Sequence, residues 1–416
     1  MSKYIINGGR KLRGTVCVQG AKNAVLPLFA AALLTDERVV IHNCPDLTDV
    51  SNMARILNSL GAETERRGDS VTIDTGYMRS HEIPSRLAGE LRSSIFTLGA
   101  LLGRAKKAKV AYPGGCDIGL RPIDIHLKAL KEMNVRIADR YGYILCDATD
   151  MRPAAVTLDY PSVGATENVM LLAATADGVT TIANAAREPE VVDLQNFLNR
   201  MGARISGAGT SFVRVEGVRS LKGTEYSTMP DRIVAGTYMI AAAVCGGEVL
   251  LRGVCPEHLA SLTAKLVESG AAIEIDGSDV LVRSDGKLRA PGCIETRPYP
   301  GFPTDLQAPF GVLASVAEGT TVVVENIFET RFKHVAELTK MGASVKVKDK
   351  VAVYTGVKAL SGAETTAMDL RGGAALVLAG LKAQGTTVVN DIHHIERGYE
   401  APEKILSSLG ADIVKV

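Results

Sequence analysis

The sequence predicts an α/β protein of two domains, each built from three copies of one unit of about 69 residues with a buried inner helix. Two observations predict this fold. A fragment of the form Leu-x-x-Leu/Met-Gly-Ala recurs along the whole chain, and a strongly apolar segment precedes each recurrence in the same phase. A period maintained over 416 residues is typical of a repeat architecture.

The recurring fragment marks the end of a helix that is followed by a strand. Its glycine position falls at residues 61, 134, 202, 270, 342 and 410, and Asn134 replaces the glycine in the second copy. Leu-x-x-Leu is helical spacing, and Gly is the usual residue just beyond a helix C-terminus. The alternating residues that follow are typical of a strand. Because these helices have a polar face, we expect them on the outside.

The apolar segments predict a second helix in each copy. They begin near Lys22, Glu90, Ser162, Pro230, Pro303 and Met368. A helix that is apolar nearly all round is a buried one, so each copy supplies one inner helix. Six buried helices exceed one core of ordinary size, which places a domain boundary near residue 230. The opening segment, YIINGGRKLRGTVCVQG, is predicted to form a hairpin-like pair of strands that joins either domain.

Composition and charge exclude several classes of function. Lys and Arg number 47 against 46 Asp and Glu, so the chain lacks the charge excess that favours nucleic acid or an anionic membrane. No apolar run reaches the roughly 18 residues that cross a bilayer, and the start resembles no signal peptide. We therefore expect a cytoplasmic protein without nucleic acid or membrane partners, and the oligomeric state stays open.

The cysteines and the glycine motifs predict no metal and no cofactor. Seven cysteines form no CxxC pair and have no histidine partner at zinc spacing, which predicts reduced thiols. His393 and His394 lack a third ligand at zinc spacing, so we interpret them as ordinary loop residues. Neither a P-loop nor a strand-linked GxGxxG occurs.

Polar side chains collect where the inner helices begin. They are Lys22, Asn23, Arg92, Ser162, Thr166, Asp231, Arg232, Asp305 and Arg371. Helix starts present N–H groups and the positive end of the dipole, which favour an anion. Ser162, Asp231 and Asp305 also fit ordinary N-caps. A cation at a helix start is unfavourable unless an anion lies beside it, so the arginines and Lys22 indicate an anion-binding site.

One glycine-rich loop carries a candidate reactive thiol. Cys116 lies within PGGCDIGLRPIDIH, between glycines and close to Arg121, Asp124 and His126. Nearby cations make a thiol reactive, whereas the competing interpretation is a small buried hydrophobic residue. We interpret the other six cysteines as packing residues.

Two loop arginines occupy the equivalent position in later copies. Arg331 follows the strand of the fifth copy, and Arg397 follows that of the sixth. A lone loop arginine is usually solvated, but a shared position in the repeat predicts that these loops form one functional set.

Seven segments resemble, in order, those of the UDP-N-acetylglucosamine enolpyruvyl transferases. They are GAKNAVLP (20–27), PGGCDIGLRPIDIH (113–126), PSVGATEN (161–168), PDRI (230–233), YPGFPTDLQAP (299–309), ENIFETRF (325–332) and the loop around Arg397. The resemblance implies two inverse α/β-barrel-like domains, each of three repeats with inner helices and outer sheets. One comprises residues 22–229 and the other residues 1–21 with 230–416, and the active site lies in the cleft between them.

The resemblance also implies an activity. It is transfer of the enolpyruvyl group of phosphoenolpyruvate to the 3-hydroxyl of UDP-N-acetylglucosamine with release of phosphate, the first committed step of peptidoglycan biosynthesis. Cys116 is implied as the proton donor, as the site of a phosphoenolpyruvate adduct and as the target of fosfomycin. Asp305 is implied to orient or deprotonate the hydroxyl, and Lys22, Arg121 and Arg397 to hold phosphate and carboxylate.

The substrate-binding residues follow from the same resemblance. They are Lys22, Asn23, Arg92, Arg121, Pro122, Ile123, Asp124, Ile125, Ser162, Val163, Gly164, Asp305, Ile327, Arg331, Arg371 and Arg397. Two positions depart from other members: Tyr160 stands where others carry Lys, and Asp117 follows the cysteine. An added carboxylate raises the pKa of a neighbouring thiol, which bears on rate.

Two alternatives remain at this point. The 5-enolpyruvylshikimate-3-phosphate synthases share the fold and the reaction type but lack the cysteine loop. A catalytically silent UDP-sugar sensor is a second alternative, which the joint presence of Cys116, Lys22, Asp305 and Arg397 disfavours.

Overall fold

The structure, a computed structural model, describes residues 2–114 and 123–416. The chain divides into two compact units, one of residues 20–114 and 123–229 and the other of residues 2–19 and 230–416. Each unit has its own hydrophobic core. No helix among the described residues is long and apolar enough to cross a membrane.

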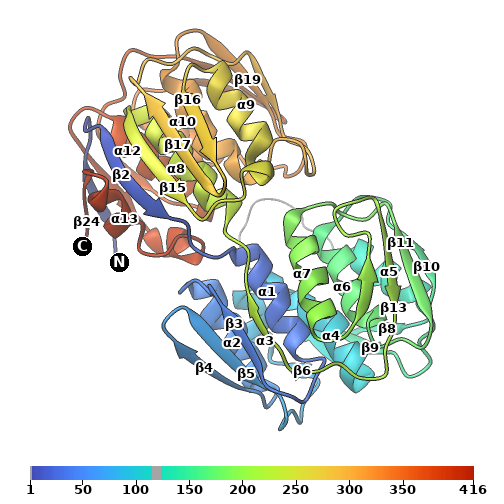
Figure 1. The fold of residues 1–416 in the computed structure, drawn as a ribbon. Coiled ribbons are helices and arrows are strands. Elements are labelled where there is room, and N and C mark those ends of the chain that lie inside the picture. The colour runs from blue at the N-terminus through green and yellow to red at the C-terminus, as the bar shows by residue number, and fades with distance from the viewer. Residues whose placement is uncertain (1, 115–122) are drawn as a thin grey trace. The chain divides into compact units, whose positions relative to one another are not determined.

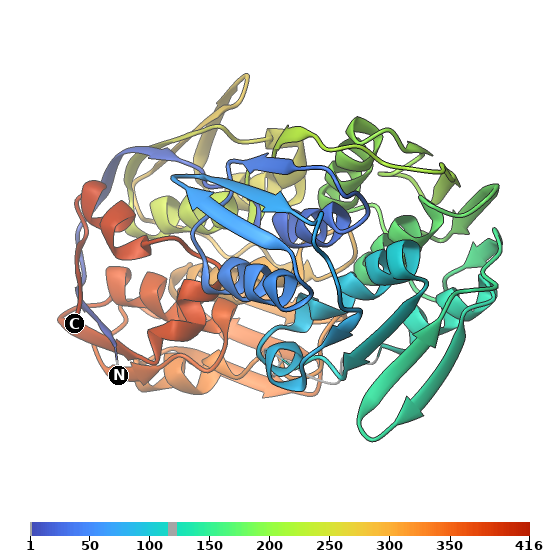
Figure 2. The same ribbon diagram turned by 90° about the horizontal axis from the view of Figure 1, so that it is seen from below.

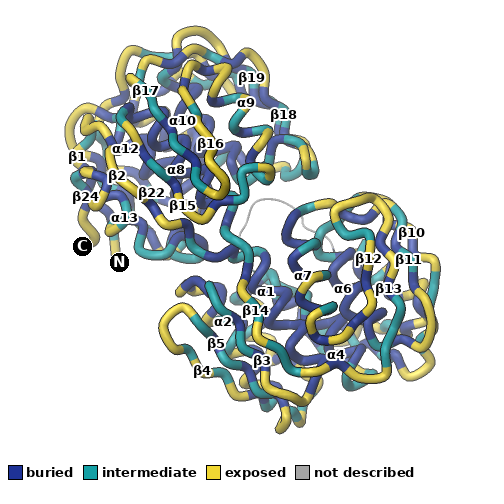
Figure 3. Tube along the Cα trace, in the orientation of Figure 1, coloured by how far each residue is buried: buried dark blue, intermediate teal, exposed yellow. Residues whose placement is uncertain are grey.

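Three inner helices fill the core of the unit of residues 20–229. They are α1 (Lys22–Ala32), α4 (Phe96–Ala105) and α6 (Val163–Ala173), and nearly all their residues are buried. Each outer helix buries one face only; these are α2 (Thr48–Ser59), α5 (Asp124–Glu132) and α7 (Pro189–Arg200). Short α3 (Ser85–Glu90) and a 3₁₀ helix, Arg92–Ile95, precede α4. Figure 3 shows the buried inner helices in dark blue.

Three four-stranded sheets cover these helices (Figure 1). Their orders are β14-β3-β5-β4, β6-β7-β9-β8 and β10-β11-β13-β12. The strands are β3 (Val39–His42), β4 (Glu63–Arg67), β5 (Ser70–Asp74), β6 (Glu82–Ile83), β7 (Lys107–Ala111), β8 (Arg136–Arg140), β9 (Tyr143–Asp147), β10 (Ala155–Thr157), β11 (Val179–Ala183), β12 (Arg204–Ser206), β13 (Phe212–Glu216) and β14 (Glu225–Ser227). The last strand, β14, returns to pair in parallel with β3, so the third copy closes on the first.

The second unit repeats this arrangement. Its inner helices are α8 (Arg232–Cys245), α10 (Gln307–Val316) and α12 (Leu370–Lys382), and its outer helices are α9 (Ala260–Glu268), α11 (His334–Lys340) and α13 (Pro402–Ser408). Its 3₁₀ helices are Pro256–Leu259, Thr304–Leu306 and Ile392–Arg397.

Its sheets have the orders β16-β17-β15-β2, β18-β19-β21-β20 and β22-β23-β1-β24. The strands are β1 (Tyr4–Asn7), β2 (Leu12–Cys17), β15 (Gly247–Arg252), β16 (Ala272–Asp276), β17 (Asp279–Ser284), β18 (Cys293–Glu295), β19 (Thr320–Val324), β20 (Ser344–Lys348), β21 (Val351–Thr355), β22 (Glu364–Thr366), β23 (Thr386–Asn390) and β24 (Asp412–Lys415).

The prediction of an N-terminal hairpin is wrong. Strand β1 pairs antiparallel with β23 and β24, which brings the two chain ends together (Figure 2), whereas β2 pairs in parallel with β15 in another sheet. The reason is that each strand completes a four-stranded sheet of this unit: β1 lies between β23 and β24, and β2 lies at the edge beside β15. Tyr4 and Ile6 are fully buried in the core of this unit, which fixes β1 in its sheet.

The six repeats and the inner helices are confirmed, but the sheets are not closed barrels. Each of the six described sheets has four strands and two edges. The six predicted helix ends have positive φ, from 63° at Asn134 to 102° at Gly202 and Gly270. This left-handed conformation suits Gly and tolerates Asn, which explains the recurring residue and its single replacement.

Candidate active site

Lys22 lies at the start of inner helix α1 and forms a buried ion pair. Its Nζ lies 3.2 Å from Oδ2 of Asp49 in the first turn of α2, and the side chains are 12% and 3% exposed. Asp49 therefore supplies the negative charge that a cation at a helix start requires. Asn23 follows on the same turn and is half-buried. The anion expected beside Lys22 is thus a side chain of the neighbouring helix.

The start of α6 is built around a capping serine and a close glycine contact. Ser162 Oγ accepts a hydrogen bond from the backbone N–H of Ala165, which confirms the predicted cap. A methyl group at Gly164 would lie 2.8 Å from Cε1 of His126, so only glycine fits there. Ser162, Val163 and Gly164 are all half-buried.

Asn168 holds three helices of this unit in register. Its Oδ1 accepts from Gly99 N–H at 2.7 Å, so its Nδ2 faces the carbonyl of Ile95 and the ring of His126. Because Nδ2 is a donor, Nδ1 of His126 accepts this 2.9 Å hydrogen bond and Nε2 carries the proton. The sequence placed Asn168 in a motif without assigning it this role.

Four further candidates of this unit lie within the described residues. Arg92 belongs to the 3₁₀ helix before α4, and its Nη1 donates to the carbonyl of Pro113 at 3.4 Å. Ile123 is buried at the N-cap of α5, Asp124 is exposed in the first turn of that helix, and Ile125 is half-buried.

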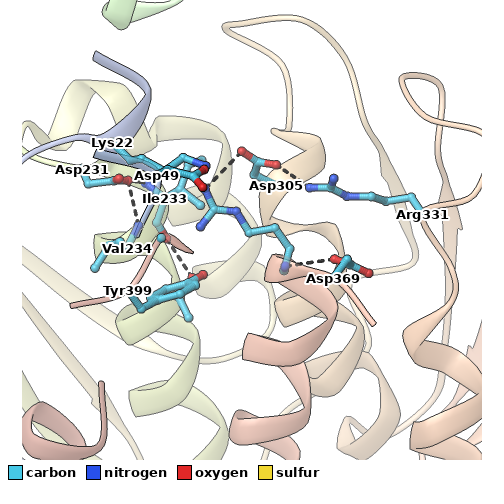
Figure 4. Close-up of polar contacts among 12 residues, drawn as sticks. Lys22, Asp49, Asp231, Ile233, Val234, Asp305, Arg331, Asp369 and Tyr399 are labelled. Carbon is cyan, nitrogen blue, oxygen red and sulfur yellow. Dashed lines mark hydrogen bonds and ion pairs between the residues drawn. The ribbon is translucent and has the colours of Figure 1, made fainter. Parts of the chain in front are cut away.

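Asp305, Arg331 and Arg371 form a charged cluster in the second unit. Figure 4 shows Asp305 directed toward Arg331. Oδ1 of Asp305 accepts from Nη2 of Arg331, and Oδ2 lies 3.4 Å from Nη2 of Arg371. The guanidinium-bearing side chains are only 4% and 3% exposed, whereas Asp305 is 25% exposed. Arg331 is thus a buried ion-pair partner and not a solvated loop residue.

The cluster leaves several guanidinium donors without a hydrogen-bond partner. Among the described residues, this holds for Nε of Arg331 and for Nε and Nη1 of Arg371. Arg371 also lies 5.4 Å from the ring centroid of Tyr399. Burial opposes the charge of Arg371, but Asp305, Tyr399 and Asp231 outweigh it and raise the pKa of Arg371. Buried charged clusters of this kind stabilise a fold weakly, which favours a functional reason for the arrangement.

The alternative interpretation of Asp305 as an N-cap does not apply, since the N-caps at this point are Pro303 and Leu306. Asp305 lies inside the 3₁₀ helix Thr304–Leu306, and its carboxylate faces the two arginines. Asp231 does cap α8, since its Oδ1 accepts from Ile233 and Val234 N–H groups (Figure 4). Asp369, which the sequence analysis did not select, caps α12 in the same way, accepting from the N–H groups of residues 371 and 372.

Glu325 is a fully buried carboxylate that accepts several hydrogen bonds, and the sequence did not reveal this role. One of its carboxylate oxygens accepts from Thr296 Oγ1 and from Ile327 N–H, and the other accepts from Thr304 Oγ1, all within 2.9 Å. Glu325 therefore fixes the loop of Ile327 and the residue before Asp305 together. A carboxylate directly after the apolar run TTVVV was the signal for it.

Three candidates, Cys116, Arg121 and Pro122, lie outside the described residues, as does Asp117. Arg397 is half-buried at the end of the 3₁₀ helix Ile392–Arg397.

The packing interpretation of the other cysteines holds only in part. Cys44, Cys146 and Cys245 are buried, and burial raises the pKa of Cys146 and Cys245 to about 12. Cys17 and Cys293 are exposed, so that interpretation is wrong for them.

Comparisons with known proteins agree with these features. Residues 6–406 match the model of a family described as EPSP synthase (3-phosphoshikimate 1-carboxyvinyltransferase). The chain is 52% identical, over all of both chains, to UDP-N-acetylglucosamine 1-carboxyvinyltransferase 2 of Caldanaerobacter subterraneus subsp. tengcongensis. It is 50% identical, again over both full lengths, to UDP-N-acetylglucosamine 1-carboxyvinyltransferase of Halothermothrix orenii. Among solved structures, the enolpyruvyl transferase NikO from Streptomyces tendae matches with a TM-score of 0.90 at 26% identity, covering 100% of this chain and 99% of that one.

Proposed function

Because the chain belongs to the UDP-N-acetylglucosamine 1-carboxyvinyltransferase family, we propose that it transfers the enolpyruvyl group of phosphoenolpyruvate to the 3-hydroxyl of UDP-N-acetylglucosamine. The observation that carries the proposal is identity of about half of all residues, end to end, with relatives of that name. The product would enter peptidoglycan biosynthesis.

The chemistry proceeds by addition and elimination. The 3-hydroxyl oxygen bonds to C2 of phosphoenolpyruvate, the hydroxyl proton goes to a base, and C3 gains a proton from an acid. In the second step C3 loses a proton and the bond from C2 to the phosphate oxygen breaks. The double bond is restored and inorganic phosphate leaves. One acid, one base and several cations therefore suffice, without a metal or an organic cofactor.

The roles are assigned to residues as the resemblance implies. Cys116 protonates C3, and Lys22, Arg121 and Arg397 bind phosphate and carboxylate, which arginine forks fit well. Asn23, Arg92, the 121–125 segment, the start of α6 and Ile327 contact the nucleotide sugar. Since Asp49 already pairs with Lys22, an anionic substrate competes with Asp49 for this lysine.

Asp305 acts on the 3-hydroxyl, and its surroundings restrict how. Both carboxylate oxygens already face a guanidinium group. A substrate hydroxyl is more easily accommodated at Oδ2, because its contact with Arg371, 3.4 Å long, is weaker than the contact of Oδ1 with Arg331. We assign Oδ2 as the atom that accepts the hydroxyl proton or orients the hydroxyl. Arg331 keeps Oδ1 in place meanwhile.

One assay with two acceptors tests the proposal. The purified protein is incubated with phosphoenolpyruvate and either UDP-N-acetylglucosamine or shikimate 3-phosphate, the acceptor that the name of the matched family points to. We expect phosphate release and an enolpyruvyl product, identified by mass spectrometry, with the nucleotide sugar only. Asp305→Asn should lower kcat by about 10²–10⁴-fold, the usual contribution of a general base. Turnover of shikimate 3-phosphate alone, or of neither acceptor, would overturn the assignment.

A further inference from the structure

A second chemically distinctive cluster lies on the loop between β15 and α9. Cys255, Glu257 and His258 each offer one ligand atom, and these atoms lie within 4.8 Å of one another. Among the described residues, these three side chains form a group that could hold one metal ion. Cys255 and His258 are half-buried and Glu257 is exposed, so the group has a sheltered side and an open side.

The local backbone explains why these side chains meet. Pro256–Leu259 is a 3₁₀ helix whose N-cap is Cys255, and the His258 N–H donates to the Cys255 carbonyl at 3.0 Å. Side chains three residues apart are eclipsed in a 3₁₀ helix, which stacks the thiol and the imidazole on one side. The spacing Cys-Pro-Glu-His thus brings two ligands together within one turn. The prediction that no cysteine has a histidine at zinc spacing is wrong here.

The donor set selects one class of cation. A thiolate and an imidazole suit Zn²⁺ and related transition metals, whereas Ca²⁺ and Mg²⁺ require mainly oxygen ligands. Zinc bonds of 2.0–2.3 Å in a tetrahedron place ligand atoms about 3.3–3.8 Å apart. Ligand atoms within 4.8 Å reach this spacing by small side-chain rotations. Water supplies the fourth ligand on the open side.

The loop holds the same position in its repeat as the loops of Cys116, Arg331 and Arg397. It follows the strand that succeeds an inner helix, here β15 after α8. The helix that follows this loop contacts the segment that leads to Asp305. Oγ of Ser261, in the first turn of α9, donates a hydrogen bond to the Gly301 carbonyl at 3.3 Å. A cation bound here would fix the start of α9 beside the segment that leads to Asp305.

We propose that Cys255, Glu257 and His258 bind one Zn²⁺ ion. The site is separate from the residues assigned to catalysis, and the bound thiol loses its proton to the solvent.

Metal titration of the full-length protein tests the site. The chelator-treated protein is titrated with Zn²⁺ against a competing indicator, and with Co²⁺, which reports a thiolate ligand through a charge-transfer absorption band. We expect one equivalent of tight binding and a thiolate band. Cys255→Ser should abolish the band, and His258→Gln should weaken Zn²⁺ binding at least tenfold.

Two control variants make the outcome decisive. Cys293→Ser removes an exposed thiol, and Cys116→Ser removes the thiol of the glycine-rich loop; both should bind Zn²⁺ as the unmodified protein does. Circular dichroism verifies that each variant is folded. The proposal is overturned if the band survives Cys255→Ser, if it disappears with Cys116→Ser instead, or if all variants bind equally weakly. None of these readouts depends on the transferase activity, so they leave the proposed function untouched.

Discussion

Removing the carboxylate of Asp305 is expected to destabilise the unit that contains it, in addition to abolishing turnover. In Asp305→Ala, the guanidinium groups of Arg331 and Arg371 lose their shared anion while both side chains stay almost fully buried. An uncompensated buried charge typically costs about 3–5 kcal/mol. Because Asp305 is itself 25% exposed, its contact with Arg371 is long and Asp231 still favours the charge of Arg371, we take the lower end, about 3 kcal/mol. Loss of a helix cap would cost only about 1 kcal/mol.

The size of the loss sets the expected change in melting temperature. For a unit of this size, 1 kcal/mol corresponds to roughly 2–4 °C, so Asp305→Ala should lower the melting temperature by about 6–12 °C. The matched control is Glu248→Ala, which removes the carboxylate of an ion pair with Arg283 whose side chains are 57% and 43% exposed. An exposed pair contributes about 0–1 kcal/mol, so this control should change the melting temperature little.

Differential scanning calorimetry of the two variants distinguishes the explanations. Inorganic phosphate should raise the melting temperature of Asp305→Ala more than that of the unmodified protein, because an anion can replace the missing carboxylate between the arginines. A melting temperature within about 2 °C of the Glu248→Ala control would refute the reasoning, since it would mean that the arginines need no partner.

Three further predictions concern reactive and titratable groups. Fosfomycin should alkylate Cys116 alone, and peptide mapping should leave the exposed Cys17 and Cys293 unmodified, because neither is assigned to the anion site. Burial raises the pKa of Asp193 from 3.8 to about 6, so its contribution to stability should be fully present below pH 3.8 and be lost as pH rises from there through 6. Asp193→Asn should remove this change in the free energy of unfolding. Glu167→Met should stabilise the protein by about 1–3 kcal/mol in a denaturant titration, because neither oxygen of this fully buried carboxyl has a hydrogen-bond partner among the described residues.

Each of these has an outcome that contradicts it. Alkylation spread over Cys17 or Cys293 would mean that exposure, and not an anion site, controls the reaction. An unchanged pH dependence in Asp193→Asn would remove that carboxyl as its source. A destabilised Glu167→Met protein would show that the carboxyl makes a contact that supports the fold.

The helices and their burial were predictable because the distribution of apolar residues around a helix determines whether it lies in the core. A helix without a polar face, such as α6 or α8, has no stable place except a core. The left-handed residue after each outer helix was equally predictable, since backbone sterics favour Gly or Asn in this conformation. Repetition made both inferences stronger, because six copies that agree exclude accidents of composition.

The partners of the first two strands were not predictable from the sequence. The alternation in Tyr4–Asn7 shows which face is buried but not which sheet receives the strand. Two strands close in sequence usually form a hairpin, and that local preference was overridden because distant repeats offered vacant edges to β1 and β2. Such edges exist only once the whole unit is assembled.

In the candidate site, too, contacts between residues close in sequence were predictable, whereas contacts between distant residues were not. Caps such as Ser162 and Asp231 act on N–H groups two or three residues away, so their residue type and position were sufficient. Asp305 has the same residue type and a similar position, yet its partners are 26 and 66 residues away.

Asp305 is a shared anion because the loop after β19, which carries Arg331, and the start of α12, which carries Arg371, both lie beside it in the folded unit. Strand β19 follows inner helix α10, and Arg331 on the loop beyond it contacts Asp305, which precedes α10. The contacts of Asp305 with Arg331 and with Arg371 follow from this arrangement. The equivalent loop of the fourth copy carries Cys255 and His258, two residues of the proposed Zn²⁺ site.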